Sequence, residues 1–122
     1  MGVYAFQWRH LDKHGRAWVK IGHYKGNNAW SRVAHRGFNS CRPGTRCMRG
    51  RVSVKDLDLV AWFPGMSRRD EGAIHRAYKD ARTGEWYPED IARAIIKALV
   101  AEHVNQAAKC DKKAAMATRR RL

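Results

Sequence analysis

Three side chains that can bind phosphate lie close together in one short segment of the sequence. Arg32 is followed by His35 and Arg36, three and four residues further on. In a helix, this spacing places all three side chains on one face. The planar guanidinium of Arg32 can hold two oxygens of one phosphate group. The segment therefore indicates a phosphate contact, although a merely solvated basic helix face would have the same composition.

A second basic segment follows directly. Residues 37–51 combine Gly, Pro, Ser and Asn with four arginines and contain no acid, which predicts a loop. Its guanidinium groups are suited to following a nucleic-acid backbone, with an affinity that depends on salt but not on base sequence. The loop arginines expected to contact nucleic acid are Arg42, Arg46, Arg49 and Arg51. A solvated loop without a partner is the alternative.

Two groups of side chains suggest transition-metal binding, and both are incomplete. Glu71 and His75 are four residues apart in a predicted helix, a spacing that most often gives only a surface contact. His35, Cys41 and Cys47 bracket the basic loop, but their spacing fits no zinc-binding pattern. Neither group predicts a metal site without further ligands.

The composition bounds what the chain can be. Its 122 residues suit one domain, and 25 Lys and Arg against 11 Asp and Glu give a formal net charge of +14, which favours a polyanionic partner. Residues 1–55 hold 12 of the basic residues and one acid, so the binding face is expected there. The sequence has no long apolar run and no secretory signal, and its three cysteines cannot all pair. We therefore expect a cytoplasmic protein with reduced thiols and no membrane contact.

The elements that must position these side chains follow from the apolar pattern. Alternating apolar residues and turn signals predict strands over 3–8, 17–21 and 57–63 and helices over 29–36, 68–82 and from 88 onward. Ser67 and Asp70 resemble a capping box at the start of the second helix. The expected fold is α+β, with a three-stranded antiparallel sheet flanked by helices. We expect one domain over residues 1–104, with the basic loop 37–51 inserted, and a frayed basic tail over 105–122.

Five short elements of the sequence carry a resemblance to a known family. In chain order they are Gly2-Val3-Tyr4, Lys20-Ile21-Gly22, Arg32, Glu71 and Gly84-Glu85-Trp86-Tyr87. In order and spacing they resemble the GIY-YIG nuclease superfamily, and most of all its small branch associated with phages and bacteria. The resemblance covers roughly residues 2–100 and leaves out the basic loop and the tail.

The resemblance implies metal-dependent cleavage of a phosphodiester bond in a nucleic acid. Glu71 would then bind Mg²⁺ or another divalent ion such as Mn²⁺, since Mg²⁺ often takes only one or two protein carboxylates. Arg32 would hold the phosphate, Tyr4 would orient or deprotonate the attacking water, and His23 would transfer a proton. The ordinary alternatives are a glutamate favoured by the helix dipole and a tyrosine buried in the core.

The sequence departs from the family pattern at one position that matters for the chemistry. Lys20 replaces the tyrosine of the second motif, the usual candidate for the general base, and a lysine acts as a base only when its pKa is lowered. The base therefore stays open among Tyr4, Lys20, His23 and Tyr24. The asparagine found late in many members has no clear match, and the Glu85-Trp86 pair could take its structural place.

The function expected from the sequence is a metal-dependent endonuclease that acts on DNA, with RNA as the other possible substrate. A catalytically inactive nucleic-acid-binding module of the same fold is the first alternative, favoured by Lys20, and a small protein-binding domain with a Trp-rich surface is the second. A chain this short has no separate domain for reading sequence. Specificity would come from nucleic-acid shape, dimerisation or a partner.

Overall fold

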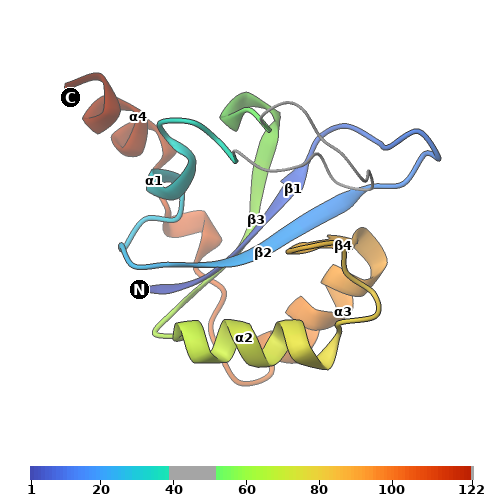
Figure 1. The fold of residues 1–122 in the computed structure, drawn as a ribbon. Coiled ribbons are helices and arrows are strands. Elements are labelled where there is room, and N and C mark those ends of the chain that lie inside the picture. Colours follow the sequence, from blue (N-terminus) through green and yellow to red (C-terminus); the bar gives the residue numbers. More distant parts are fainter. Residues whose placement is uncertain (39–51, 122) are drawn as a thin grey trace.

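The computed structural model describes residues 1–38 and 52–121 of the chain (Figure 1). Its strands and helices are, in chain order, β1 (Gly2–Trp8), β2 (Trp18–Tyr24), α1 (Trp30–Val33), β3 (Leu57–Pro64), α2 (Arg68–Ala77), β4 (Trp86–Pro88), α3 (Glu89–Val100) and α4 (Lys112–Arg121). Two short 3₁₀ helices cover Val54–Asp56 and Ala107–Lys109. Among the helices of the described part, none has the length and apolar character needed to cross a lipid bilayer.

The strands form one antiparallel sheet in the order β3-β1-β2-β4. The α+β class and the antiparallel sheet are confirmed, but the expected number of three strands is wrong. The fourth strand, β4, is an edge strand that pairs with β2 from Trp18 to Lys20. It contains only Trp86, Tyr87 and Pro88, too few residues to show the alternation from which a strand is predicted.

The hairpin between β1 and β2 is held by Asp12. One of its carboxylate oxygens accepts hydrogen bonds from the backbone N–H groups of His14 and Arg16, at 2.8 and 2.9 Å. The other accepts a 2.8 Å bond from the indole nitrogen of Trp18, the first residue of β2. Gly15 adopts a positive φ of 77°, which a residue with a side chain rarely adopts. These contacts explain why the polar stretch turns where the sequence predicts it.

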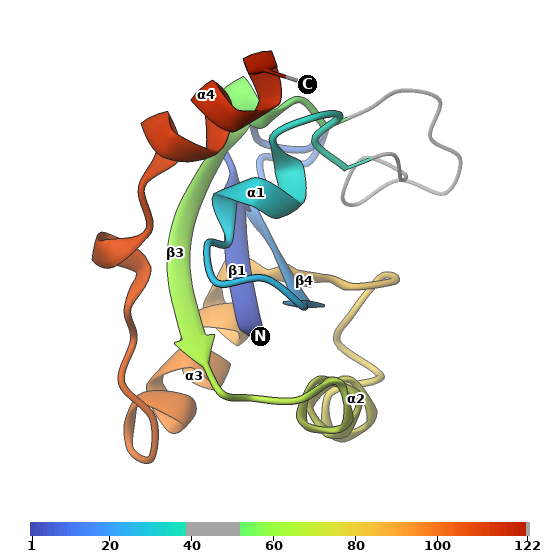
Figure 2. The same cartoon turned by 90° about the vertical axis from the view of Figure 1, so that its left-hand side faces the viewer.

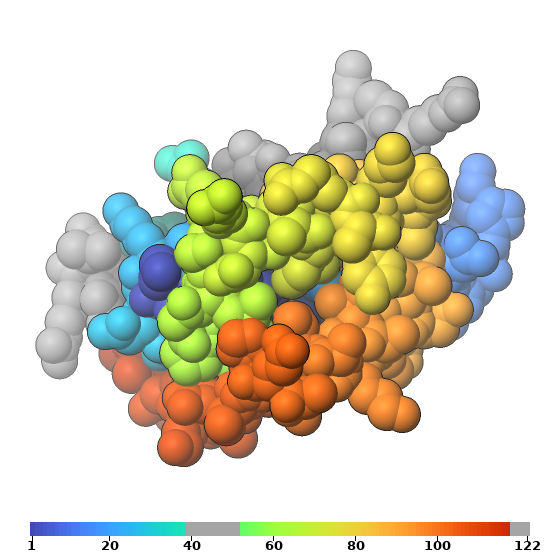
Figure 3. All heavy atoms as spheres, turned by 90° about the horizontal axis from the view of Figure 1, so that it is seen from below, coloured from blue at the N-terminus to red at the C-terminus, as the bar shows by residue number. Residues whose placement is uncertain are grey.

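Each face of the sheet packs against its own layer of helices (Figure 2). Alternate residues of β1 and β2 point to opposite faces, and each set joins a separate apolar cluster. Tyr4, Phe6 and Trp18 pack with α1 and α4. The other face is covered side by side by α2 and α3 (Figure 3), through residues that include Ile74 and Ile95. The sheet is therefore buried on both sides.

The two predicted helices that follow β3 are present, but α2 ends at Ala77 rather than at residue 82. In α2 the Ser67 hydroxyl accepts a bond from the Asp70 backbone N–H at 3.1 Å, and the Asp70 side chain accepts from the Ser67 backbone N–H at 2.7 Å. This reciprocal capping box fixes the start of α2. Pro88 precedes the first turn of α3, in which Glu89 and Asp90 complement the helix dipole.

The segment after residue 105 is more ordered than its composition predicts. Lys112–Arg121 form the helix α4, so the expectation of a frayed tail is wrong for these residues. The helix packs on α1 through the buried Ala115, while Lys112 Nζ lies 4.6 Å from the ring centre of Trp30. The Asn28 side-chain amide also donates a 2.8 Å hydrogen bond to the carbonyl of Asp111. Contacts with residues far away in the sequence stabilise a segment whose own apolar pattern is weak.

Candidate active site

The hydroxyl of Tyr4 lies at the centre of the candidate site. Tyr4 and Gly22 face each other across β1 and β2, and the phenol packs so closely on Gly22 that any side chain there would overlap it. The Arg32 side chain, from α1, is hydrogen-bonded to the Tyr4 hydroxyl. Burial raises the pKa of Tyr4 above its ordinary value, and the Arg32 charge only partly offsets this. Tyr4 therefore keeps its proton at neutral pH.

Phe38 provides the apolar platform on which the basic groups of the site rest. The Lys20 ammonium lies 4.8 Å and the Arg32 guanidinium 5.2 Å from the centre of its ring. The Tyr4 ring stacks on it at a centroid distance of 5.8 Å. Phe38 is held by a two-way backbone pairing with Val52, at 2.9 Å in each direction. One ring thus fixes three polar side chains that come from β1, β2 and α1.

Lys20 is a buried lysine whose ammonium faces the carboxylate of Glu85 and also interacts with the charge of Glu71. Its side chain is only 7% exposed, and its Nζ lies 3.7 Å from an oxygen of Glu85. The Trp86 ring covers it on another side, at 5.6 Å from Nζ to the ring centre. Burial lowers the pKa of Lys20, the Glu85 charge opposes that change, and the positive charge of Arg32 adds to it. The environment thus favours the neutral amine more than water does.

Glu71 reaches the end of β2 from the first turn of α2. Its carboxylate accepts a hydrogen bond from the backbone N–H of His23, just beyond the residues of β2 that pair with β4. The side chain is 17% exposed. Burial raises the pKa of Glu71, and the negative charge of Glu85 raises it further. A cation bound between the two carboxylates would relieve this repulsion.

The two glutamates share a third potential ligand, His75. Its Nε2 lies 3.9 Å from an oxygen of Glu71 and 3.9 Å from an oxygen of Glu85. One ligand atom from each of the three residues lies within 4.8 Å of the other two. His75 Nε2 is buried and has no hydrogen bond of good geometry within the described ranges, and the backbone of Ile21 makes only a weak polar contact with the imidazole. Two carboxylates and an unpartnered imidazole nitrogen suit a divalent metal ion.

The structure brings together four of the residues singled out for chemistry in the sequence. Tyr4, Lys20 and Arg32 surround the Phe38 ring, and Glu71 is linked to Lys20 through His75 and Glu85. Tyr4 and Arg32 approach from the α1 side of the sheet, and Glu71 approaches from α2. Their roles in catalysis stay predictions, but their convergence is a property of the fold.

His23 differs from these four residues. It pairs with Val3, whose side chain belongs to the cluster under α2 and α3, so its imidazole lies on the face of the sheet opposite to Tyr4. Burial lowers the pKa of His23, and the positive charges of Arg68 and of the amino terminus add to this effect. What His23 brings to the site is the backbone N–H that holds Glu71.

The predicted nucleic-acid contacts lie partly within the described structure. Arg32 is exposed in α1, and His35 and Arg36 are exposed in the turn that follows. This turn ends at Gly37, where the positive φ of 61° closes the segment as the sequence predicts. The remaining predicted contacts, Arg42, Arg46, Arg49 and Arg51, lie outside the described residues. Cys41 and Cys47 also lie outside them.

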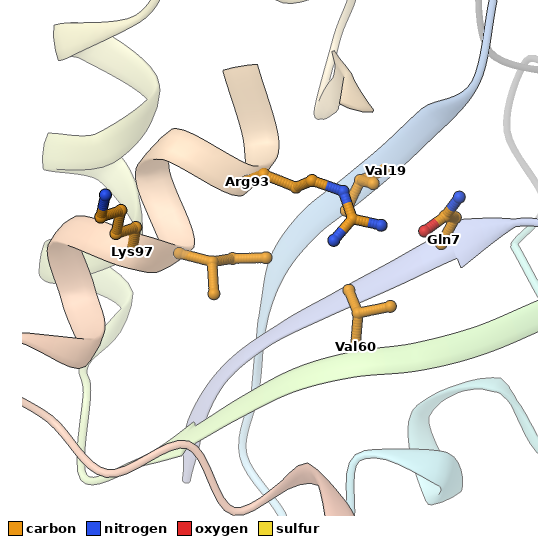
Figure 4. A pocket seen from close by; sticks show the side chains of 6 residues that line it. Gln7, Val19, Val60, Arg93 and Lys97 are labelled. Carbon is orange, nitrogen blue, oxygen red and sulfur yellow. The ribbon is translucent and has the colours of Figure 1, made fainter. Parts of the chain in front are cut away.

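A separate hollow lies between α3 and the sheet (Figure 4). It has a volume of about 200 Å³ and is lined by Gln7, Val19, Val60, Arg93, Ile96 and Lys97. Arg93 is paired with Glu89 at 2.8 Å, and Gln7 donates a 3.0 Å bond to the same carboxylate. Its lining combines apolar side chains with Gln7 and Arg93, which are already paired with Glu89, and with Lys97. It offers no arrangement for acid-base or metal chemistry.

The contribution of His75 and Glu85 could not be predicted from sequence alone. The spacing of Glu71 and His75 suggested an incomplete pair, and Glu85 completes the group from the loop before β4. The backbone N–H of Ile21 donates a 3.0 Å bond to the carbonyl of Glu85, which fixes that loop against β2.

No family model, curated protein or solved structure matches the chain.

Proposed function

We propose that the protein is a metal-dependent endonuclease that hydrolyses phosphodiester bonds of DNA. The observation that carries this proposal is the grouping of Tyr4, Lys20 and Arg32 around the Phe38 ring, with Glu71 linked to Lys20 through His75 and Glu85. These are residues of the elements that resemble GIY-YIG nucleases. Phosphodiester hydrolysis needs a positioned water, charge neutralisation at the phosphoryl oxygens and support for the leaving oxygen, and the site has groups for each task.

Arg32 is the residue that we propose to hold the scissile phosphate. Its side chain is exposed, while its guanidinium is fixed by the Phe38 ring at 5.2 Å and by the Tyr4 hydroxyl. A guanidinium with free N–H groups can bind two phosphate oxygens in a defined geometry. This arrangement supports a role in orienting the phosphate as well as in neutralising its charge.

Glu71 is the residue that we propose as the principal ligand of a divalent metal ion, either Mg²⁺ or an ion such as Mn²⁺. Its carboxylate is held by the His23 N–H and faces Glu85. Such an ion would supply Lewis-acid stabilisation of the charge that develops on the phosphoryl group. We propose that the protein holds Glu71 and Arg32 in one site, linked through Glu85 and Lys20, so that one phosphate can meet both the ion and the guanidinium.

Tyr4 and Lys20 are the groups that we propose to position the attacking water. Tyr4 stays protonated because burial raises its pKa, so its hydroxyl can orient a water but cannot remove a proton from it. Lys20, whose pKa burial lowers, is the better proton acceptor of the two. Among Tyr4, Lys20, His23 and Tyr24, we therefore propose Lys20 as the proton acceptor.

The charge of the chain supports a nucleic acid as the partner. The formal net charge is +14, and Arg32, His35 and Arg36 are exposed on one side of the candidate site. Contacts of this kind bind the phosphate backbone of DNA or RNA with an affinity that falls as salt rises. The arginine-rich segment 37–51 follows these residues directly in the sequence.

A catalytically inactive nucleic-acid-binding module is the second candidate function. The Lys20 ammonium lies 3.7 Å from Glu85, and this ion pair would keep both groups from acting on a substrate if it persists when nucleic acid binds. The two candidates differ in one measurable property. The endonuclease cuts the nucleic acid that it binds, whereas the module only binds it.

Nicking of supercoiled plasmid in Mg²⁺ or Mn²⁺ tests the proposal. We expect cleavage by the wild type and at least about a hundredfold loss in Glu71→Ala and in Arg32→Ala. The matched controls are Glu102→Ala and Arg76→Ala, which replace exposed residues outside the site and are expected to keep full activity. Plasmid binding without cleavage in any divalent ion would favour the inactive module. Absence of binding even at low salt would contradict both candidates.

A further inference from the structure

The buried nitrogen of His75 has no use in the proposed function as derived so far. We infer that His75, Glu71 and Glu85 form a three-ligand site that selects a first-row transition-metal ion over Mg²⁺. This inference names the metal of the same site and therefore rests on the proposed function for what the ion does. The geometry of the three side chains carries the inference.

The ligand atoms are spaced as one metal ion requires, after small movements. When each bond is about 2.1 Å long, two ligands of one ion lie about 3 to 4.2 Å apart. The distances from His75 Nε2 to Glu71 and to Glu85 are both 3.9 Å, and all three ligand atoms lie within 4.8 Å of one another. A shift of less than 1 Å in the partly exposed Glu85 side chain would close the widest separation.

The surroundings fix the imidazole in the orientation that a metal ligand needs. Nδ1 of His75 lies 2.7 Å from the Tyr87 hydroxyl, and the two rings stack with an interplanar angle of 7°. With an ion on Nε2, the proton resides on Nδ1 and is donated to the Tyr87 oxygen, as is usual for a metal-binding histidine. Tyr87 itself is fully buried, so the partner cannot swing away.

Glu85 is oriented in a comparable way. One carboxylate oxygen faces the Lys20 ammonium at 3.7 Å, and the other faces His75 at 3.9 Å. Lys20 therefore interacts with Oε1 of Glu85, and Oε2, which faces His75, is left for an ion. The acidic groups of the site are Glu71 and Glu85, and the positively charged groups nearby are Lys20 and Arg32. A divalent ion would add positive charge, which favours binding of the negatively charged phosphodiester.

The imidazole nitrogen is what decides the class of metal. Mg²⁺ prefers oxygen ligands and gives up its waters reluctantly, whereas the affinity of a site with a nitrogen ligand rises along the first-row ions from Mn²⁺, the weakest, to the later ones. Two carboxylates alone would suit Mg²⁺. A metal ion that accepts the lone pair of the buried His75 Nε2 would offset the free-energy cost of burying this nitrogen without a hydrogen bond of good geometry.

Electron paramagnetic resonance of bound Mn²⁺ tests the inference without reference to cleavage. We expect one Mn²⁺ per chain, with a spin-echo modulation from a directly bound ¹⁴N nucleus. We also expect Mn²⁺ to bind at least about tenfold more tightly than Mg²⁺, measured by competition. In His75→Gln the nitrogen modulation is expected to disappear and the Mn²⁺ to Mg²⁺ preference to fall toward one, because the amide offers oxygen to both ions.

Two further variants keep the test decisive if His75→Gln folds poorly. Glu85→Gln, whose side chain is 43% exposed, is expected to weaken both ions similarly and to keep the nitrogen modulation. His14→Gln replaces an exposed histidine in the hairpin turn and is the matched control, expected to bind Mn²⁺ as the wild type does. Circular dichroism of each variant verifies the fold.

The possible failures of the inference and of the proposed function can be told apart. A Mn²⁺ spectrum without nitrogen modulation, or a metal preference that His75→Gln leaves unchanged, overturns the inference, even when the protein cuts DNA with Mg²⁺. Bound Mn²⁺ with nitrogen modulation, in a protein that cuts neither DNA nor RNA, supports the inference and contradicts the proposed function.

Discussion

The Tyr4 hydroxyl occupies the space in which a side chain at Gly22 would lie. The two residues face each other across β1 and β2, and a Cβ built on Gly22 would overlap both the hydroxyl oxygen and the ring carbon that bears it. The glycine of the Lys20-Ile21-Gly22 motif is therefore needed to bring the phenol against the strand. Because Gly22 has no side chain, the Tyr4 ring can lie against β2, and this places its hydroxyl near Arg32.

Gly22→Ala is expected to displace Tyr4 and to disturb the site more than the fold. Forcing a methyl group into this contact should lower the free energy of unfolding by about 1–3 kcal/mol, and cleavage should fall by at least about tenfold. Gly72→Ala is the matched control, because its Cβ would meet only the flexible end of Arg76 and because alanine favours a helix. Thermal unfolding and plasmid nicking measure both effects. Full activity in Gly22→Ala would show that Tyr4 does not need this position.

Phe38 is expected to act as a positioning residue. Its ring contacts Lys20, Arg32 and Tyr4, and Phe38→Leu keeps an apolar side chain but removes the aromatic face. We expect a loss of about 1–2 kcal/mol in the free energy of unfolding and a larger relative loss of cleavage. A merely structural role would leave the cleavage rate of the folded fraction unchanged. Comparing kcat with KM separates the two roles, because misplaced groups lower kcat.

Lys20→Met separates function from stability. The lysine is buried beside Phe38 and Trp86, and methionine of similar length removes a charge whose burial is unfavourable while leaving the partly exposed Glu85 in contact with water. We expect unchanged or higher thermal stability together with loss of cleavage. Lys97→Met, at an exposed position of α3, is the control and should keep cleavage. A Lys20→Met protein that cleaves normally would exclude Lys20 from the chemistry.

The stability of the hairpin is expected to depend on pH through Asp12. Its hydrogen bond from the Trp18 indole, followed by those from the backbone of Arg16 and His14, lowers the pKa of Asp12 below its ordinary value. A carboxyl with a lower pKa in the folded state stabilises the fold above its unfolded pKa of about 4, and that stabilisation is lost as the pH falls through the folded pKa.

The pH dependence of thermal unfolding, followed from pH 7 down to pH 2, measures this contribution. Asp12→Asn should be less stable than the wild type at neutral pH, and the difference should shrink as the pH falls below about 4. Asp80→Asn replaces an exposed aspartate after α2 and is the control. A constant difference across the whole pH range would contradict the assigned role of the Asp12 charge.

Most of the sheet and the two long helices on one of its faces could be predicted from the sequence, because their signals are local. The capping box at Ser67 and the turn after Trp8 depend on residues close together in the chain. The strand β4 and the helix α4 could not be predicted. They are stabilised by pairing with β2 and by packing on α1, contacts that no local pattern contains.

The same distinction applies to the candidate site. Motifs pointed to Tyr4, Lys20, Arg32 and Glu71, and these residues meet in the fold. The His75–Glu85 contact joins residues on α2 and on the loop before β4, so only the folded chain reveals it. The placement of the His23 imidazole follows from strand alternation, which the family resemblance did not take into account.

Single-turnover cleavage of a labelled DNA duplex at saturating protein tests the central claim most directly. The wild type is compared with Glu71→Gln, and binding to the same duplex is measured by fluorescence anisotropy. We predict equal binding, with cleavage by the wild type in a divalent ion and at least about a hundredfold slower cleavage by the variant. Equal cleavage rates in the two proteins, or binding without cleavage in the wild type, would contradict the claim that these residues form a phosphodiester-cleaving site.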